Sequence, residues 1–131
     1  VESGIQKFMD LSGKHTTKDK LHRGVQLCEE AGIKTLAFFM FGLQGETAAD
    51  REETSRFARE LNTDFVSFHK VYPYQKSDIY LSDLQSHKEI DAHIFQSYLK
   101  YYLRFAHLKR CDLATLIRSF RLFWGRLITL T

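Results

Sequence analysis

The stretch IKTLAFFMF, residues 33–41, is followed directly by GLQGET, residues 42–47. Nearly every side chain of the first segment is apolar, which is the pattern of a β-strand buried on both faces. The two glycines of the second segment predict a turn. Thr47 and Asp50 then form a helix-capping pattern, so a helix is expected to begin there. The sequence thus predicts a buried strand, a short loop and a helix in succession.

Two further helices are predicted before this strand. Apolar residues one turn apart indicate a short helix that ends before Gly13, namely Ile5, Phe8 and Met9. Thr16 or Thr17 can cap a second helix, with Asp19 placed to complete the capping pattern, and Gly32 is expected to end it. The inner face of this second helix is expected to carry Leu21, Val25 and Cys28.

A second strand is predicted after the helix that follows the loop. The segment AADREETSRFARELN, residues 48–62, is typical of a helix with Phe57, Ala58 and Leu61 on its inner face. The segment DFVSFHKVY, residues 64–72, is typical of a strand. The order helix, strand, helix, strand allows parallel pairing. The fold class is therefore α/β, either a doubly wound sheet or part of a (β/α) barrel.

The composition limits the possible classes of protein. With 131 residues the chain is the size of one domain, and 44% of them are hydrophobic. No apolar run approaches the ~20 residues of a membrane span, and the first residues lack the pattern of a signal peptide. Cys28 and Cys111 are too far apart to indicate a disulfide framework or a metal clip. Two such cysteines favour a reducing compartment, so a cytoplasmic location is expected.

The last third of the chain differs in charge and periodicity. Residues 98–131 hold seven Lys or Arg and one acid, a net +6, against −3 for residues 1–97. Two apolar stripes at helix spacing predict a helical tail: Phe95, Tyr98, Leu99 and Tyr102, then Leu113, Leu116, Ile117, Phe120, Trp124 and Leu127. Both stripes are interpreted as packing surfaces. The basic side chains beside the second stripe are Arg118, Arg121 and Arg126.

The loop after the first strand is a candidate ligand site. Ligands of parallel α/β sheets bind where strands end and the following loops begin. Gly42 and Gly45 lie at such a point, and glycine lets a backbone approach a ligand closely. Thr47 begins a helix whose free N–H groups favour anionic or polar ligand groups. The spacing is not that of a phosphate-binding P-loop, because no Gly-Lys-Ser/Thr follows. Ordinary turn chemistry also explains two glycines here.

Three stretches together resemble one family. They are VESG (1–4), GIKTLAFFMFGLQGET (32–47) and VYPYQKSDIY (71–80), and the family's short motifs Glu-Ser-Gly, Ala-Gly-Ile and Gly-Leu-x-Gly-Glu-Thr correspond to VESG, AGI (31–33) and GLQGET (42–47). In this order they resemble the second half of a radical S-adenosylmethionine domain, of the cobalamin-linked branch often labelled Fe–S oxidoreductases. The resemblance implies that residues 1–81 form the C-terminal portion of a partial (β/α) barrel and residues 82–131 a helical extension. It implies S-adenosylmethionine and a 4Fe–4S cluster as cofactors, with cobalamin as a further candidate.

The resemblance also implies roles for single residues. Glu2 corresponds to a polar group on the ribose hydroxyls, and Ser3 and Gly4 shape its loop. Met40 corresponds to an apolar residue that packs on adenine. The remaining contacts to adenine would come from a loop beneath the ring and from the backbone of the last strand: Gly42, Gly45, Glu46, Val71 and Tyr72. His69 and Lys70 are expected to face a substrate, although a histidine on a strand is more often structural. The resemblance names no catalytic residue and no substrate.

The chain departs from the family pattern at three places. Gln44 replaces a proline, and Lys76-Ser77 replaces Gly-Thr, so both loops are expected to differ in shape. The Cys-x-x-x-Cys-x-x-Cys cluster motif is absent, and no metal ligand is assigned. We therefore expect a C-terminal fragment of an oxidoreductase-like or transferase-like enzyme, inactive alone. Its missing N-terminal part would be its partner, and uncovered strand edges and apolar surface would favour self-association.

A second hypothesis needs no enzyme. The chain would then be a non-catalytic α/β interaction module, whose basic and aromatic tail docks on a protein, a membrane surface or a nucleic acid. Replacing Arg118, Arg121 and Arg126 would abolish that binding. A three-cysteine motif upstream in the gene would instead support the enzyme. The sequence implies no membrane or nucleic-acid partner firmly.

Overall fold

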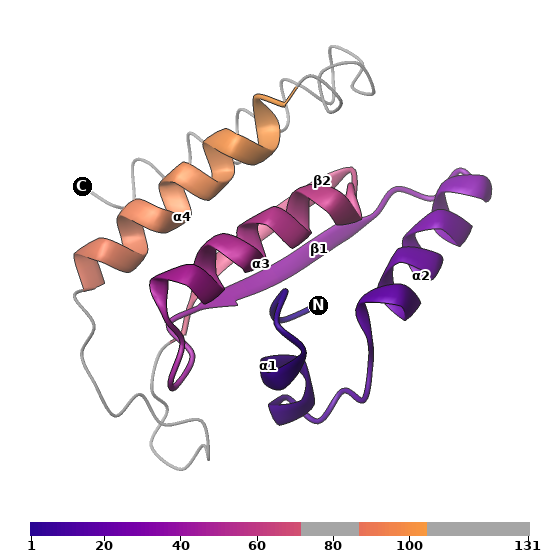
Figure 1. Ribbon diagram of the computed structural model, residues 1–131. Helices are drawn as coiled ribbons and strands as arrows, with labels where there is room; N and C mark the ends of the chain where they lie inside the picture. Colours follow the sequence, from indigo (N-terminus) through magenta and orange to yellow (C-terminus); the bar gives the residue numbers. More distant parts are fainter. Residues whose placement is uncertain (72–86, 105–131) are drawn as a thin grey trace.

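A computed structural model of the chain describes residues 1–71 and 87–104 (Figure 1). The elements in chain order are α1 (Gln6–Leu11), α2 (Lys18–Glu30), β1 (Leu36–Phe41), α3 (Ala48–Leu61), β2 (Phe65–Lys70) and α4 (His87–Tyr102). The α/β class predicted from the sequence is confirmed, and so is the order of its helices and strands. None of the helices in the described ranges is long and apolar enough to cross a membrane.

The two strands form a parallel sheet. Their register runs from Leu36 opposite Phe65 to Phe41 opposite Lys70, and α3 connects them. The predicted parallel pairing is therefore confirmed. On the opposite edge of β1, the carbonyl of Glu2 accepts a hydrogen bond from the Met40 N–H at 2.8 Å. The lateral order is thus the amino-terminal segment, then β1, then β2.

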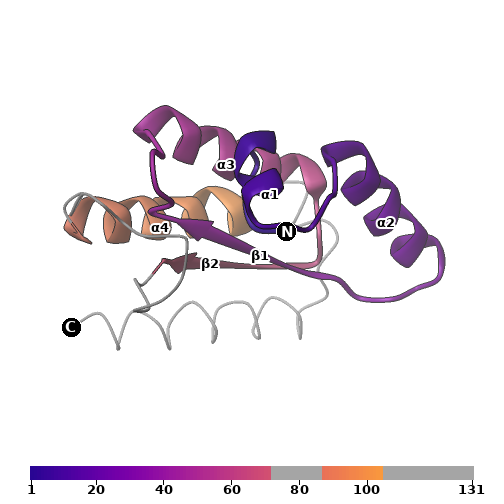
Figure 2. The same ribbon diagram turned by 90° about the horizontal axis from the view of Figure 1, so that it is seen from below.

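The core lies between one face of the sheet and the helices. Figure 2 shows α1, α2 and α3 on one side of the two strands. The Phe39 ring lies edge-on to Phe57 of α3, and the Phe68 ring lies edge-on to Tyr98 of α4. The buried residues of this core are Ala37, Phe39, Phe41, Phe57, Ala58, Leu61, Val66, Phe68, Ile90, Ile94, Tyr98 and Tyr101. The predicted inner face of α3 is thereby confirmed.

The other face of the sheet corrects one expectation. We call it the open face, and it consists of Leu36, Phe38, Met40, Phe65, Ser67 and His69. Leu36 and Phe38 are 49% and 48% exposed. The prediction that β1 is buried on both faces is therefore wrong for the described residues. Burial alternates along β1 because the helices of residues 1–71 and 87–104 pack against the opposite face.

The ends of α2 and α3 follow local sequence signals. Thr17, the second of the two predicted candidates, caps α2 by accepting a hydrogen bond from the Lys20 N–H at 3.3 Å. Asp19 lies one residue too early to complete a capping box. Gly32 follows the helix with φ of 69°, as expected of a glycine that ends a helix. The predicted capping box of α3 is complete, with reciprocal bonds between Thr47 and Asp50.

Helix α4 packs on the same core as the rest of the fold. Its buried residues include Ile90, Ile94, Tyr98 and Tyr101, whereas Phe95 is exposed. Tyr98 and the partly buried Tyr102, both in the predicted stripe, pack on this core, so the stripe is confirmed at these two positions and wrong at Phe95. The second stripe, Cys111 and the three tail arginines lie outside the described residues. So does the predicted boundary between residues 81 and 82.

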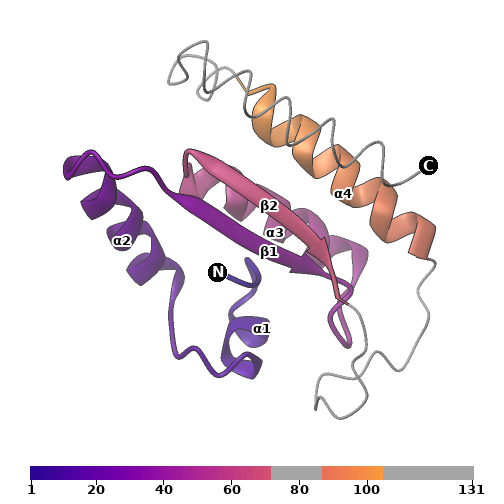
Figure 3. The ribbon, with the colours of Figure 1, turned by 180° about the vertical axis from the view of Figure 1, so that it is seen from behind.

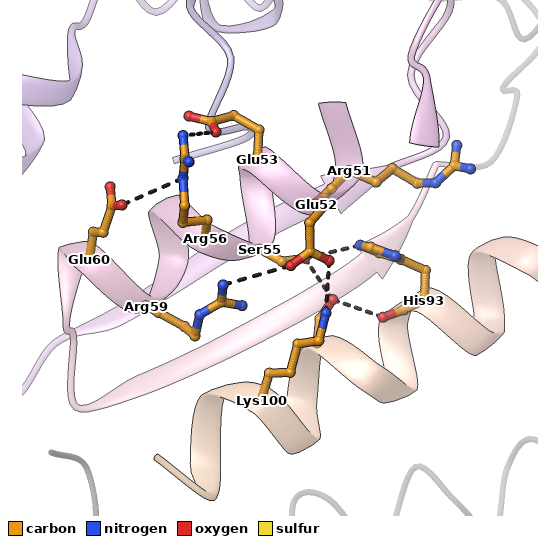
Figure 4. Close-up of polar contacts among 10 residues, drawn as sticks. Arg51, Glu52, Glu53, Ser55, Arg56, Arg59, Glu60, His93 and Lys100 are labelled. Carbon is orange, nitrogen blue, oxygen red and sulfur yellow. Dashed lines mark hydrogen bonds and ion pairs between the residues drawn. The ribbon is translucent and has the colours of Figure 1, made fainter. Parts of the chain in front are cut away.

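Polar contacts also join α3 to α4 (Figure 4). The Ser55 hydroxyl lies 3.0 Å from His93 Nε2 and 2.7 Å from the Ser97 hydroxyl. Lys100 Nζ donates to the Glu52 carboxylate at 2.8 Å. Partial burial lowers the pKa of His93 below its ordinary value, which favours the neutral imidazole within this contact.

Two tyrosines of α4 occupy the outer edge of β2. Figure 3 shows β2 between β1 and α4. The Tyr98 hydroxyl accepts from the Phe68 N–H at 2.9 Å and donates to the Phe68 carbonyl at 3.3 Å. The Tyr102 hydroxyl makes the same pair of bonds with Val66, each at 3.1 Å. Four helical residues rise about 6 Å and two strand residues about 6.6 Å, so the spacings match. This edge, expected to be uncovered, is therefore partly occupied.

Replacing Tyr98 with phenylalanine is expected to lower the free energy of unfolding by about 2 kcal/mol. The substitution keeps the ring but removes both hydrogen bonds between the hydroxyl and the buried backbone of Phe68, and the loss of buried hydrogen bonds is costly. Urea denaturation followed by circular dichroism measures this loss. Tyr102→Phe, at a less buried pair, is the matched comparison and is expected to cost less. An unchanged stability of Tyr98→Phe would contradict the role given to this hydroxyl.

Candidate functional site

Three separate segments meet at the carboxyl end of β1. The amino-terminal segment contacts β1 through the Glu2 carbonyl and the Met40 N–H. The end of β2 contacts it through the Val71 N–H, which donates to the Phe41 carbonyl at 2.9 Å. The loop of residues 42–46 leaves β1 at the same point. The structure thus brings together the described residues that the family resemblance selected, whereas Tyr72 lies outside the described residues.

The loop of residues 42–46 has the geometry of a tight turn. Gly42 and Gly45 have φ values of 87° and 73°, a backbone conformation that residues with a Cβ atom rarely adopt. The Glu46 N–H donates to the Leu43 carbonyl at 2.9 Å and closes a four-residue turn. Gly45 occupies the third position, where a type II turn requires positive φ, and Gln44 the second, where proline is common. Gln44 therefore stands in a turn of the kind that the family's proline favours.

Replacing Gln44 with proline is accordingly expected to raise the free energy of unfolding by about 0.4–1 kcal/mol. Proline restricts the unfolded chain at a position whose turn geometry it can adopt. Within the described part of the chain, the Gln44 N–H makes no hydrogen bond that proline would remove. Thermal unfolding compares this variant with Gln44→Ala, for which little change is expected. A lower melting temperature for the proline variant would contradict the turn assignment.

Glu46 lies inside this loop. The residue is 2% exposed, and its Oε2 accepts a hydrogen bond from the Gly42 N–H at 2.5 Å. Burial raises the pKa of Glu46 to about 7, against the opposing effect of the Gly42 N–H and the Arg51 guanidinium. Glu46 also precedes the N-cap Thr47, so Asp50, and not Glu46, is the acid of the first helical turn. No local pattern in the sequence predicted the bond between Glu46 and Gly42.

The amino-terminal segment is fixed against α3. Ser3 is fully buried, and its hydroxyl lies 3.2 Å from the Thr54 hydroxyl. The Gly4 N–H donates to the same Thr54 oxygen at 3.1 Å. These contacts hold the segment that carries Glu2 against α3. The carboxylate of Glu2 forms an ion pair with Lys14.

The two residues that were expected to face a substrate, His69 and Lys70, lie on opposite faces of the sheet. His69 lies on this face beside Phe38, with ring centroids 5.7 Å apart, and its Nε2 is 2.9 Å from the Ser67 hydroxyl. Lys70 points to the opposite face, where its Nζ donates to Asp91 of α4 at 2.7 Å. Met40, half-buried, is the register partner of His69 on the open face. His69 and Met40 therefore share a surface, and Lys70 belongs to the contact between β2 and α4.

The described residues offer no cluster for a metal ion. Within residues 1–71 and 87–104, no three His, Cys, Asp or Glu side chains are grouped as metal ligands would be. Cys28 is a free, half-buried thiol on α2. The described ranges thus supply candidate contacts for an organic ligand at the carboxyl end of β1, and no ligand set for an iron–sulfur cluster.

Comparison with known proteins finds relatives for part of the chain. No family model matches it. It is 37% identical over 80 residues to an anaerobic magnesium-protoporphyrin IX monomethyl ester cyclase of Rubrivivax gelatinosus, covering 61% of this chain and 14% of that protein. It is 32% identical over 74 residues to a protein of the same name from Cereibacter sphaeroides, covering 56% of this chain and 12% of that protein. An uncharacterized methyltransferase of Pyrococcus horikoshii is 28% identical over 74 residues, and the match covers 56% of this chain and 16% of that protein. The chain thus spans less than a fifth of the length of each relative.

Proposed function

We propose that this chain is part of a radical S-adenosylmethionine Fe–S enzyme and that it supplies contacts to the ribose and adenine of S-adenosylmethionine. One observation carries the proposal. Glu2, Met40, the loop of residues 42–46 and Val71 come from separate stretches of sequence, and they lie together at the carboxyl end of one parallel strand. The similarity to enzymes named as cyclases supports an enzymatic parent protein of this class.

The arrangement of the helices supports a partial barrel. The amino-terminal segment, β1 and β2 follow one another laterally, and α2 and α3, which precede and follow β1, lie on the same side of the strands (Figure 2). Successive crossovers in one direction with helices on one side build a barrel, whereas a doubly wound sheet places helices on both faces. The open face would then line the interior of the barrel.

The residues present fit an adenosine group. Met40 offers a half-buried apolar side chain on the open face, and Glu2 a carboxylate that can accept from two hydroxyls. In the loop of residues 42–46, Gly42 and Gly45 leave the backbone open to close approach by a ligand. When bound, S-adenosylmethionine beside a 4Fe–4S cluster would supply a 5′-deoxyadenosyl radical for hydrogen abstraction from a substrate. The cluster ligands would lie elsewhere in the parent protein. Cobalamin, a cytoplasmic location and self-association remain expectations from the sequence.

Electron paramagnetic resonance tests the proposal on the parent protein. The protein is reconstituted anaerobically with iron and sulfide, reduced, and titrated with S-adenosylmethionine. A 4Fe–4S signal that changes on titration is expected. A protein without a cluster, or with a cluster whose signal ignores S-adenosylmethionine, would contradict the proposed function.

Glu2→Ala is expected to raise the dissociation constant for S-adenosylmethionine by about tenfold or more. Loss of hydrogen bonds to a charged group costs roughly 1.5–3 kcal/mol, while the cluster signal itself should be unchanged. The titration above measures both quantities. Glu30→Ala removes an exposed carboxylate at the end of α2 and serves as the control, with unchanged affinity expected. Equal affinity of Glu2→Ala and the unsubstituted protein would exclude the ribose role of Glu2.

A further inference from the structure

We infer that Glu46 is a positioning residue, which holds the loop of residues 42–46 in its ligand-binding shape from inside and does not itself touch the ligand. The inference rests on the proposed function, because it assigns the loop to the adenine site. It replaces the direct contact to adenine that the family resemblance implied for Glu46. It also makes the shape of the loop depend on the protonation of one buried carboxyl group.

The contacts of Glu46 are directed into the loop. Its Oε2 accepts from the N–H of Gly42, the first loop residue, and its own N–H donates to the carbonyl of Leu43. Side chain and backbone of one residue therefore close the loop at two successive positions. Glu46 is 2% exposed, so its side chain lies inside the folded loop, where its Oε2 meets the Gly42 N–H.

Both ends of the loop are attached to regular structure. Gly42 follows β1 directly, and Thr47, next to Glu46, is the N-cap of α3 with a complete capping box. Gly42 has φ of 87°, a conformation open to glycine and rarely to other residues. The Glu46 carboxyl group fixes the N–H of this residue, and with it the direction in which the backbone leaves β1. Loss of that bond would free the part of the loop that meets the ligand.

The charges around Glu46 explain why the bond responds to pH. Burial disfavours the carboxylate, while the Gly42 N–H and the nearby Arg51 guanidinium favour it, and Asp50 disfavours it again. These effects leave the pKa of Glu46 at about 7. The bond to Gly42 is charge-assisted when Glu46 is ionised and neutral when it is protonated, and charge-assisted bonds are the stronger. The environment of the Gly42 amide should therefore change near neutral pH.

Nuclear magnetic resonance of the 131-residue chain tests the contact without a ligand. Glu46→Ala is expected to speed hydrogen exchange of the Gly42 amide by about tenfold, the equivalent of one hydrogen bond. Glu46→Gln keeps a carbonyl acceptor and should retain the protection. The Gly42 amide shift should titrate with a midpoint near pH 7 in the unsubstituted chain and stay constant in Glu46→Gln. Glu60→Ala, at an exposed carboxylate of α3, is the control and should change neither quantity.

The outcomes separate this inference from the proposed function. Unchanged Gly42 exchange in Glu46→Ala, or a pH-dependent Gly42 shift that persists in Glu46→Gln, would overturn the inference, and the second readout serves even if Glu46→Ala fails to fold. In the reconstituted parent protein, Glu46→Ala should weaken S-adenosylmethionine binding about tenfold and Glu46→Gln should restore it. If the contact to Gly42 is verified but no variant binds S-adenosylmethionine, the positioning role stands and the proposed function fails.

Discussion

Replacing Gly4 with alanine is expected to lower the free energy of unfolding by about 3 kcal/mol. A Cβ atom at this position would lie 2.7 Å from the Thr54 Cα and 2.8 Å from the Phe57 Cβ. The first of these atoms belongs to the backbone of α3 and cannot turn away, so the amino-terminal segment would have to move off the helix. That movement would also stretch the hydrogen bond from the Gly4 N–H to the Thr54 hydroxyl.

The control for this experiment is a second glycine with the opposite expectation. Gly24 lies in the interior of α2, and a Cβ atom there would meet nothing within 4 Å. Gly24→Ala should therefore raise the free energy of unfolding by about 0.5–1 kcal/mol, because alanine favours the helix. Urea denaturation followed by circular dichroism measures both variants. A Gly4→Ala protein as stable as the unsubstituted chain would show that Gly4 is not kept small by its contact with α3.

Gly4 also shows what the sequence could reveal and what it could not. The motif VESG marked the position as part of a loop, but nothing in it pointed to Thr54, 50 residues away. Local signals predicted well because their physics is local. The capping box of Thr47 and Asp50 and the glycine that follows α2 are decided within one helical turn. The close contact of two segments depends on the assembled fold.

The strand β1 illustrates a second limit. A continuous apolar run is typical of a strand with two covered faces, and here the described helices cover one of them. The hydrophobicity of a side chain shows that it favours burial, but it does not show which element packs against it. The same reasoning applies to α4, where apolar residues at helix spacing identified the helix and the two tyrosines that pack on β2, but did not predict that Phe95 is exposed.

The candidate site also has features that the sequence could predict and features that it could not. Family motifs selected residues that the fold brings to one end of β1, since motif order and strand order are both preserved in a parallel α/β unit. They did not reveal the burial of Glu46, because an acid beside a helix start is ordinarily exposed. The buried carboxyl group is expected to make the stability of the chain depend on pH, which the sequence pattern did not predict.

Glu46 is expected to make the chain less stable as the pH rises through neutrality. Its pKa is raised from 4.5 in the unfolded chain to about 7 in the folded one, so folding favours the protonated form. The stabilisation that this shift contributes is fully present below pH 4.5, the pKa of the group in the unfolded chain, and it is lost as the pH rises through about 7. The difference of the two pKa values corresponds to about 3 kcal/mol between pH 4.5 and pH 8.5.

The measurement compares unfolding free energies of the unsubstituted chain and Glu46→Gln between pH 4.5 and 8.5. Glutamine cannot ionise, so the stability of Glu46→Gln relative to the unsubstituted chain should rise by about 3 kcal/mol across this range. Other groups act in the opposite direction, since the lowered pKa of His93 removes stability as the pH falls. The comparison cancels their effect because both proteins contain them. Glu60→Gln, at an exposed carboxylate, should show the same dependence of the unfolding free energy on pH as the unsubstituted chain. If the stability of Glu46→Gln follows the same pH dependence as that of the unsubstituted chain, the Glu46 carboxyl group does not titrate between pH 4.5 and 8.5 in the folded chain, and burial does not raise its pKa as described.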